Sequence, residues 1–108
     1  MPHDELPLSL RVRIEDALAS IPDPELGIDI YNLGLIGDIG IGDDGSVRVE
    51  YTLTRLGCPA APFLHEAIVR NVASLAGVTA VDAELVMHPP WTPERMSEDA
   101  RTALLGGV

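Results

Sequence analysis

The 108-residue chain contains a single cysteine and no lysine, and the first scarcity already restricts where it works. One cysteine cannot form an intrachain disulfide, and the first eight residues hold two prolines and two acidic residues where a secretory signal would need basic and apolar segments. We therefore expect a cytoplasmic protein. No apolar run approaches the ~20 residues that a helix needs to cross a bilayer, which excludes a transmembrane role.

Basic side chains are few. The chain has seven arginines and seventeen acidic residues, which give a formal net charge of -10. Such a surface repels the phosphates of nucleic acids and of anionic lipids, so we expect neither a nucleic-acid nor a membrane partner. The acidic residues are spread over both halves, as in many well-solvated domains. The length fits one domain over residues 1–108.

Common catalytic and cofactor-binding motifs are also missing. The chain contains no CxxC, HExxH, GxxxxGK or GxSxG pattern, and its GxGxxG match over residues 40–45 lies in a turn between two predicted strands rather than between a strand and a helix. The usual zinc, dinucleotide, triphosphate and serine-hydrolase functions therefore lack their starting evidence. We expect a protein that is not an enzyme.

Apolar periodicity predicts two helices. Apolar residues recur at helical spacing from Leu10 to Ile21, where Pro22 ends the pattern, and again over residues 59–76, where Gly77 is suited to follow a helix end. The segment 22–33, between the first helix and the first strand, is predicted to be an ordered loop.

Alternating apolar residues predict three strands, over residues 35–41, 47–54 and 81–88. In the first strand, Ile36 is placed with Asp38 on the outer face. Glycine and aspartate at positions 42–45 predict an antiparallel hairpin between the first two strands. Since amphipathic helices must bury their apolar stripes, we predict an α+β fold: a two-layer α/β sandwich in the order helix, strand, strand, helix, strand, with a short helical C-terminal tail. Thr92 and Ser97 are placed to cap short helices in that tail.

Cys58 lies where the second strand pattern stops and the second helix pattern begins. A thiol at a helix N-terminus faces unpaired N–H groups and the positive end of the helix dipole, which favour the thiolate that binds metals and attacks electrophiles. Gly57 removes bulk beside the thiol, Pro59 is suited to the first helical position, and Thr54 leaves a hydroxyl nearby. A buried, purely structural cysteine is the alternative.

Asp23 and Glu25 form a carboxylate pair around Pro24. A stiff acidic turn of this kind is able to supply oxygen ligands or a general base, or else it ends the first helix with two solvated acids. The sequence leaves both interpretations open.

Histidines offer no ligand pair. His65 lies about 10 Å along the predicted helix from Cys58, too far to share one ion, and a Cys–His dyad would need His88. Trp91 is either a core residue or an anchor for a partner protein.

Several motifs occur together in one order. They are Asp23-Pro24-Glu25-Leu26-Gly27, Leu33-Gly34-Leu35, Thr52-Leu53-Thr54, Gly57-Cys58-Pro59 and the segment 89–97. With them the chain resembles the SufT and PaaD-like metal-sulfur cluster assembly factors from Leu10 to Leu104. The cysteine-rich, zinc-binding C-terminal segment of longer PaaD-like proteins is missing, which favours a stand-alone SufT-like role.

The resemblance implies a domain of the iron-sulfur cluster assembly type that matures clusters or delivers them to apoproteins. The functional thiol maps onto Cys58, and the acidic turn of Asp23 and Glu25 is expected near it. Thr54 and Gly57 fall in the stretch that shapes the pocket. Relatives often read Thr-Thr-Pro-Gly before the cysteine, whereas this chain has Arg55-Leu56-Gly57, and the direction of the Arg55 side chain stays open.

Three functions follow from these residues. In the first, Cys58 transiently binds iron or a cluster with help from Asp23 or Glu25, and the chain works with the assembly machinery and apoprotein clients. Because one thiolate cannot hold a cluster alone, a second copy in a homodimer, a client or a small thiol completes the coordination, and the isolated protein need not hold a cluster. The rivals are an adaptor that recognises partners through Trp91 without binding a cluster, and a thiol-dependent enzyme with Cys58 as nucleophile.

Overall fold

The structure, a computed structural model, describes residues 9–55 and 59–105. Its elements are α1 (Leu10–Leu18), β1 (Ile36–Ile41), β2 (Ser46–Tyr51), α2 (Ala61–Ala73), β3 (Ala80–Leu85), the 3-10 helix η2 (Pro93–Arg95) and α3 (Glu98–Leu105). This succession confirms the predicted order and the helical C-terminal tail. Within these ranges no helix has the length and apolar character needed to cross a membrane.

The three strands form one mixed sheet with β2 in the middle. β1 pairs with β2 in the antiparallel direction, as the predicted hairpin requires, whereas β3 pairs with β2 in the parallel direction. A parallel pair needs a crossover connection, and α2 supplies it. Gly45 closes the hairpin at φ +89°, where an added Cβ would lie 2.4 Å from the carbonyl oxygen of Gly77.

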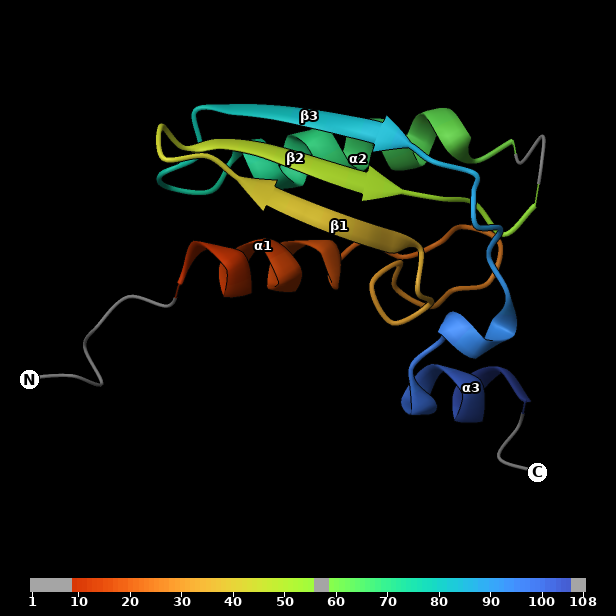
Figure 1. Cartoon of the computed structure of the whole chain (residues 1–108). Helices are drawn as coiled ribbons and strands as arrows, with labels where there is room; N and C mark the ends of the chain where they lie inside the picture. The colour runs from red at the N-terminus through yellow and green to blue at the C-terminus, as the bar shows by residue number, and fades with distance from the viewer. Residues whose placement is uncertain (1–8, 56–58, 106–108) are drawn as a thin grey trace, which may run out of the picture.

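Both long helices lie on the same face of the sheet (Figure 1). Every second residue of β2 points toward them, because side chains alternate across a strand. The buried core residues of α1, β2 and α2 are Ile14, Leu18, Val47, Val49, Tyr51, Leu64, Ala67, Ile68 and Val72. The predicted two-layer α+β architecture is confirmed, and the opposite face of the sheet carries polar side chains.

Two helix boundaries differ from the prediction. α1 ends at Leu18 rather than at Ile21, since the Ile21 N–H bonds the carbonyl of Leu18 in a turn, at 3.2 Å. α2 begins at Ala61 rather than at residue 59, and the proline in its first turn is Pro62. Pro59 lies in the preceding turn, so its placement at the first helical position was wrong.

A β-bulge in β1 changes which side chains reach the core. Ile36 pairs with Tyr51 and Ile39 with Val49, so β1 advances three residues where β2 advances two. Ile36 consequently packs on the core together with Ile39. Simple alternation had placed Ile36 with Asp38 on the outer face, and the extra residue of the bulge explains the difference.

The segment 22–33 is the ordered loop that the sequence predicted. Pro22 and Asp29 form an isolated antiparallel bridge, and the Ile30 N–H donates to the carbonyl of Ile21 at 2.9 Å. Ile30 and Leu33 are buried and anchor the loop in the core.

The C-terminal segment packs on the end of this loop (Figure 1). The Ser97 N–H donates to the carbonyl of Asn32 at 2.8 Å, and an added Cβ at Gly34, where φ is +79°, would lie 2.1 Å from the carbonyl oxygen of Arg95. Ser97 also accepts a hydrogen bond from the Ala100 N–H at 3.1 Å, which confirms its predicted capping role. Loop and tail therefore form one packed unit beside the sheet.

Candidate functional site

Asp23 holds the acidic turn together from inside. Its side chain is only 3% exposed, and its Oδ2 accepts hydrogen bonds from the N–H groups of Glu25 (3.2 Å) and Leu26 (2.9 Å). This is the local side-chain-to-backbone bonding that fixes aspartate turns. The interpretation of Asp23 as a solvated acid was therefore wrong, because a carboxylate that accepts backbone N–H groups is buried as part of the turn.

Glu25 joins the acidic turn to the segment that follows β2. Its Oε2 lies 2.8 Å from a guanidinium nitrogen of Arg55, with side chains 33% and 59% exposed respectively. An exposed ion pair of this kind adds little to stability, so its importance lies in what it positions. The side chain of Arg55, whose direction the sequence left open, faces Glu25.

Cys58 and Gly57 lie outside the described residues. On either side, the described residues end at Arg55 and resume at Pro59, which is exposed and precedes the buried Ala60. The ion pair of Glu25 therefore places the acidic turn beside a residue only three positions before Cys58 in the sequence.

Thr54 and Trp91 line an apolar groove of about 200 Å³. The lining residues are Leu53, Thr54, Arg55, Met87, His88, Pro90 and Trp91. Trp91 is half-buried against the core, and its Nε1 donates to the carbonyl of Leu33 at 2.7 Å. Trp91 thus packs in the fold and borders a groove at once, and its partner-binding role stays a prediction.

A second, charged cleft of about 230 Å³ lies next to this groove. Its lining residues are Gly37, Asp38, Glu50, Tyr51, Thr52, Val86, His88, Pro89 and Arg95. His88 borders both hollows. Sequence reasoning missed this cleft, because Arg95 is far in sequence from the hairpin that carries Asp38 and Glu50, and each residue alone resembles an ordinary surface charge.

His65 is exposed on α2 and is not among the residues that line the two clefts. Its Nδ1 lies 3.0 Å from the hydroxyl oxygen of Tyr51, the last residue of β2. Burial raises the pKa of the Tyr51 phenol above its ordinary value, because the charged phenolate is poorly solvated there.

Iron would not find a complete ligand set in the described part of the chain. Over residues 9–55 and 59–105, no three histidine, aspartate or glutamate side chains are grouped so that they could hold a metal ion. The carboxylates assigned to the metal, Asp23 and Glu25, lie in one turn, but Glu25 and not Asp23 contacts Arg55 in the segment after β2. The assignment of Cys58, Asp23 and Glu25 as metal ligands stays a prediction.

A family model described as iron-sulfur cluster assembly protein matches residues 11–83. The chain belongs to this family. The predicted resemblance to the SufT and PaaD-like assembly factors is confirmed, and a general role in iron-sulfur cluster assembly follows.

Curated relatives of this assembly family match over most of the chain. The Fe-S protein maturation auxiliary factor YitW of Bacillus subtilis is 41% identical over 96 residues, which are 89% of this chain and 94% of that protein. The maturation auxiliary factor SufT of Staphylococcus aureus is 40% identical over 82 residues, covering 76% and 93%. An iron-sulfur cluster carrier protein of Mycobacterium tuberculosis is 39% identical over 95 residues, 88% of this chain but 23% of the carrier.

A solved structure confirms the fold of the assembly family. The crystal structure of a domain of unknown function, DUF59, from Bacillus anthracis superposes with a TM-score of 0.85 at 33% sequence identity. It covers 90% of this chain and 92% of that one. The shared fold therefore extends over most of this chain.

Proposed function

We propose that this chain is a non-catalytic, cytoplasmic maturation factor whose Cys58 transiently binds iron or an iron-sulfur cluster and passes it to apoproteins. The metal is cargo rather than a resident cofactor. The observation that carries the proposal is the ion pair of Glu25 with Arg55, which brings a carboxylate beside the residues that lead into Cys58. The name of the mycobacterial carrier protein, whose sequence includes a similar domain, supports it further.

Glu25, rather than Asp23, is the carboxylate that we assign to assist the thiol. Asp23 would have to give up two backbone hydrogen bonds inside the turn before it could bind a metal ion. Glu25 lies at the surface in an ion pair with Arg55, and an exposed ion pair opens at a cost of about 1 kcal/mol or less. Arg55, close in sequence to Cys58, would also favour the thiolate if the two groups approach each other.

Additional ligands must come from another molecule. Clusters are ordinarily held by several thiolates, and this chain has one cysteine. A second copy of the chain, a client protein or a small thiol would complete the coordination. Incomplete coordination makes the bound cargo labile, which suits transfer from the assembly machinery to an apoprotein.

Anaerobic reconstitution with iron and sulfide tests the proposal. Visible absorbance and oligomeric state are followed for the wild type, Cys58→Ser and Glu25→Gln, with Glu66→Gln as a matched control at an exposed glutamate on α2. We expect a chromophore that Cys58→Ser abolishes, Glu25→Gln weakens and Glu66→Gln leaves unchanged. A chromophore of full intensity in folded Cys58→Ser protein would refute the carrier role.

The apolar groove favours a second candidate, an adaptor that binds partners without holding a cluster. Its lining combines Trp91, Met87 and Leu53, the kind of apolar hollow that receives a partner side chain. A complementation assay separates the two functions. It measures whether a variant of this chain restores the activity of a cluster-dependent enzyme in cells that lack the chain. The adaptor predicts that Cys58→Ser restores activity and Trp91→Ala does not, whereas the carrier predicts failure of Cys58→Ser; thermal unfolding checks that Trp91→Ala is folded.

A further inference from the structure

Opposite charges line the charged cleft from two different parts of the fold. The strands contribute carboxylates, Asp38 from β1 and Glu50 from β2. The segment after β3 contributes His88, and η2 contributes Arg95. Within residues 9–55 and 59–105, no ion pair joins Arg95 or His88 to either carboxylate. The cleft therefore keeps its acidic and basic sides apart.

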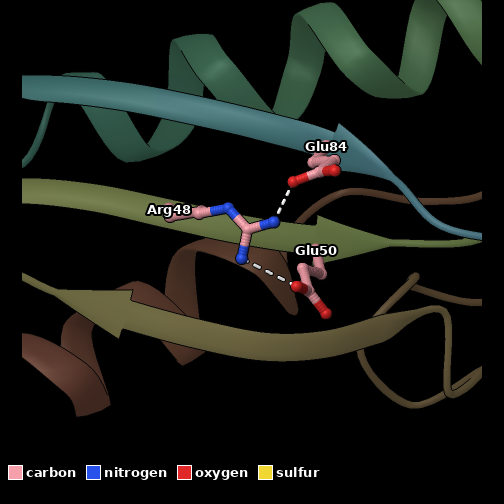
Figure 2. A network of polar contacts seen from close by, with 3 residues as sticks. All are labelled: Arg48, Glu50 and Glu84. Atoms are coloured by element: carbon pink, nitrogen blue, oxygen red, sulfur yellow. Dashed lines mark hydrogen bonds and ion pairs between the residues drawn. The ribbon is translucent and has the colours of Figure 1, made fainter.

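The acidic side is held in place by the sheet itself. Figure 2 shows Arg48 on the face of the sheet opposite the helices, between Glu50 and Glu84. One guanidinium nitrogen lies 2.7 Å from the Glu50 Oε2, and the other contacts Glu84. Glu50 is thereby tethered to its own strand. Asp38 forms no hydrogen bond or ion pair with any side chain that the structure describes, so its charge is available to a ligand.

The basic side is positioned by the packing of η2 on the loop. The Arg95 N–H donates to the carbonyl of Thr92 at 2.9 Å, and the backbone of Arg95 lies against Gly34, where even one methyl group would not fit. Arg95 is half-buried, yet in the described part of the chain its guanidinium has no carboxylate partner. By contrast, Arg48 and Arg55 are both ion-paired.

From this arrangement we infer that the charged cleft binds a small zwitterion of the amino-acid class, with its carboxylate on Arg95 and its ammonium group on Asp38. A simple anion would meet two carboxylates in a chain of net charge -10, and a simple cation would meet the guanidinium of Arg95. A molecule with both charges satisfies both sides and is neutral overall. The volume of about 230 Å³ is below the ~300–1,000 Å³ of typical drug-sized sites, which suits a ligand of this size.

Binding of the zwitterion does not depend on Cys58 or on iron. The contact residues come from β1, β2, the segment after β3 and η2, and guanidinium–carboxylate contacts need no metal. Cys58→Ser protein should therefore bind the zwitterion as the wild type does, whatever becomes of the carrier proposal.

An NMR titration of the full chain tests the inference. Amide chemical shifts are followed without iron and in a buffer that is not zwitterionic. The probes are L-alanine and L-cysteine, with N-acetyl-L-alanine lacking the ammonium charge and L-alaninamide lacking the carboxylate. We expect saturable shifts around Asp38 and Arg95 with the two amino acids, at concentrations on the order of 10 mM or below. We expect at least roughly tenfold weaker binding of each single-charge analogue.

Variants assign the binding to the two charges. Asp38→Asn and Arg95→Gln should each weaken L-alanine binding by roughly tenfold, since each removes one charge-assisted contact. Arg101→Gln, which changes an exposed arginine on α3 outside the cleft, should bind L-alanine as the wild type does. Asp38 is exposed on an edge strand, so its variant keeps the test valid even if Arg95→Gln misfolds. No saturable binding, equal binding of single-charge analogues, or unchanged binding by Asp38→Asn would overturn the inference.

Discussion

Substitution of Gly34 by alanine should detach the C-terminal segment from the loop that carries the acidic turn. Gly34 has φ +79°, and its added Cβ would lie 2.1 Å from the carbonyl oxygen of Arg95. Backbone atoms cannot yield at that distance, so η2 must move away. Gly27 offers a matched control, because it has nearly the same φ of +76° but no atom within 4 Å of an added Cβ.

The expected magnitude follows from the contacts that would be lost. Alanine in the left-handed region costs about 1 kcal/mol at either glycine. Displacement of η2 in Gly34→Ala also breaks the hydrogen bond from Ser97 to Asn32 and that from Trp91 to Leu33, which contribute about 1 kcal/mol each. We therefore expect the free energy of unfolding to fall by about 3 kcal/mol in Gly34→Ala and by about 1 kcal/mol in Gly27→Ala.

Urea unfolding followed by tryptophan fluorescence measures both quantities. Trp91 is the only tryptophan of the chain and sits on the displaced segment, so its emission reports local detachment as well as global unfolding. The difference of about 2 kcal/mol corresponds to a shift in the urea midpoint of about 1 M, and native Gly34→Ala protein should already show altered emission. Equal midpoints and unchanged native emission in the two variants would refute the steric reasoning.

Two other predictions concern titrating groups. Because burial raises the pKa of Tyr51 above 10.0, the fold gains stability from the neutral phenol below that pH and loses it as pH rises through the pKa in the folded protein. Tyr51→Phe should flatten the fall in urea midpoint between about pH 8 and pH 11, because phenylalanine has no group to ionise. The same change removes the hydrogen bond to His65 and lowers the free energy of unfolding by about 1 kcal/mol at neutral pH. A fall in midpoint as steep as that of the wild type would contradict this cause. The hydroxyl and N–H of Ser46 hold the pKa of Asp44 below 3.8, so NMR titration of Ser46→Ala should find a higher Asp44 pKa, and an unchanged value would contradict the assignment.

Local patterns in the sequence predicted the elements that depend on near neighbours. Alternation on either side of residues 42–45 was enough for the β1–β2 hairpin, and Ser97 was recognised as a cap from its place in the tail. The bulge that turns Ile36 inward was not predictable, because it depends on how β1 fits against β2 rather than on the spacing within β1.

The site was predictable only in part, for a related reason. The acidic turn was predicted from Asp23, Pro24 and Glu25 themselves, and its nearness to Cys58, which the family resemblance implies, stays a prediction. Nothing in local spacing indicated that Asp23 is buried while Glu25 reaches Arg55. The basic wall of the charged cleft was missed, since Arg95 reaches it only because η2 packs on Gly34, far away in the sequence.

The mixed sheet also has a consequence for the order in which the chain folds. The antiparallel partners Ile41 and Val47 are six positions apart, whereas the parallel partners Ser46 and Ala80 are 34 positions apart. Closing the longer loop costs about 1.5 kcal/mol more chain entropy, so the hairpin is expected to form first and the β2–β3 pair later. The end of the sheet beside both clefts, where β3 must be docked, would then be completed late, and neither cleft would have its full lining before Leu85 has paired with Tyr51.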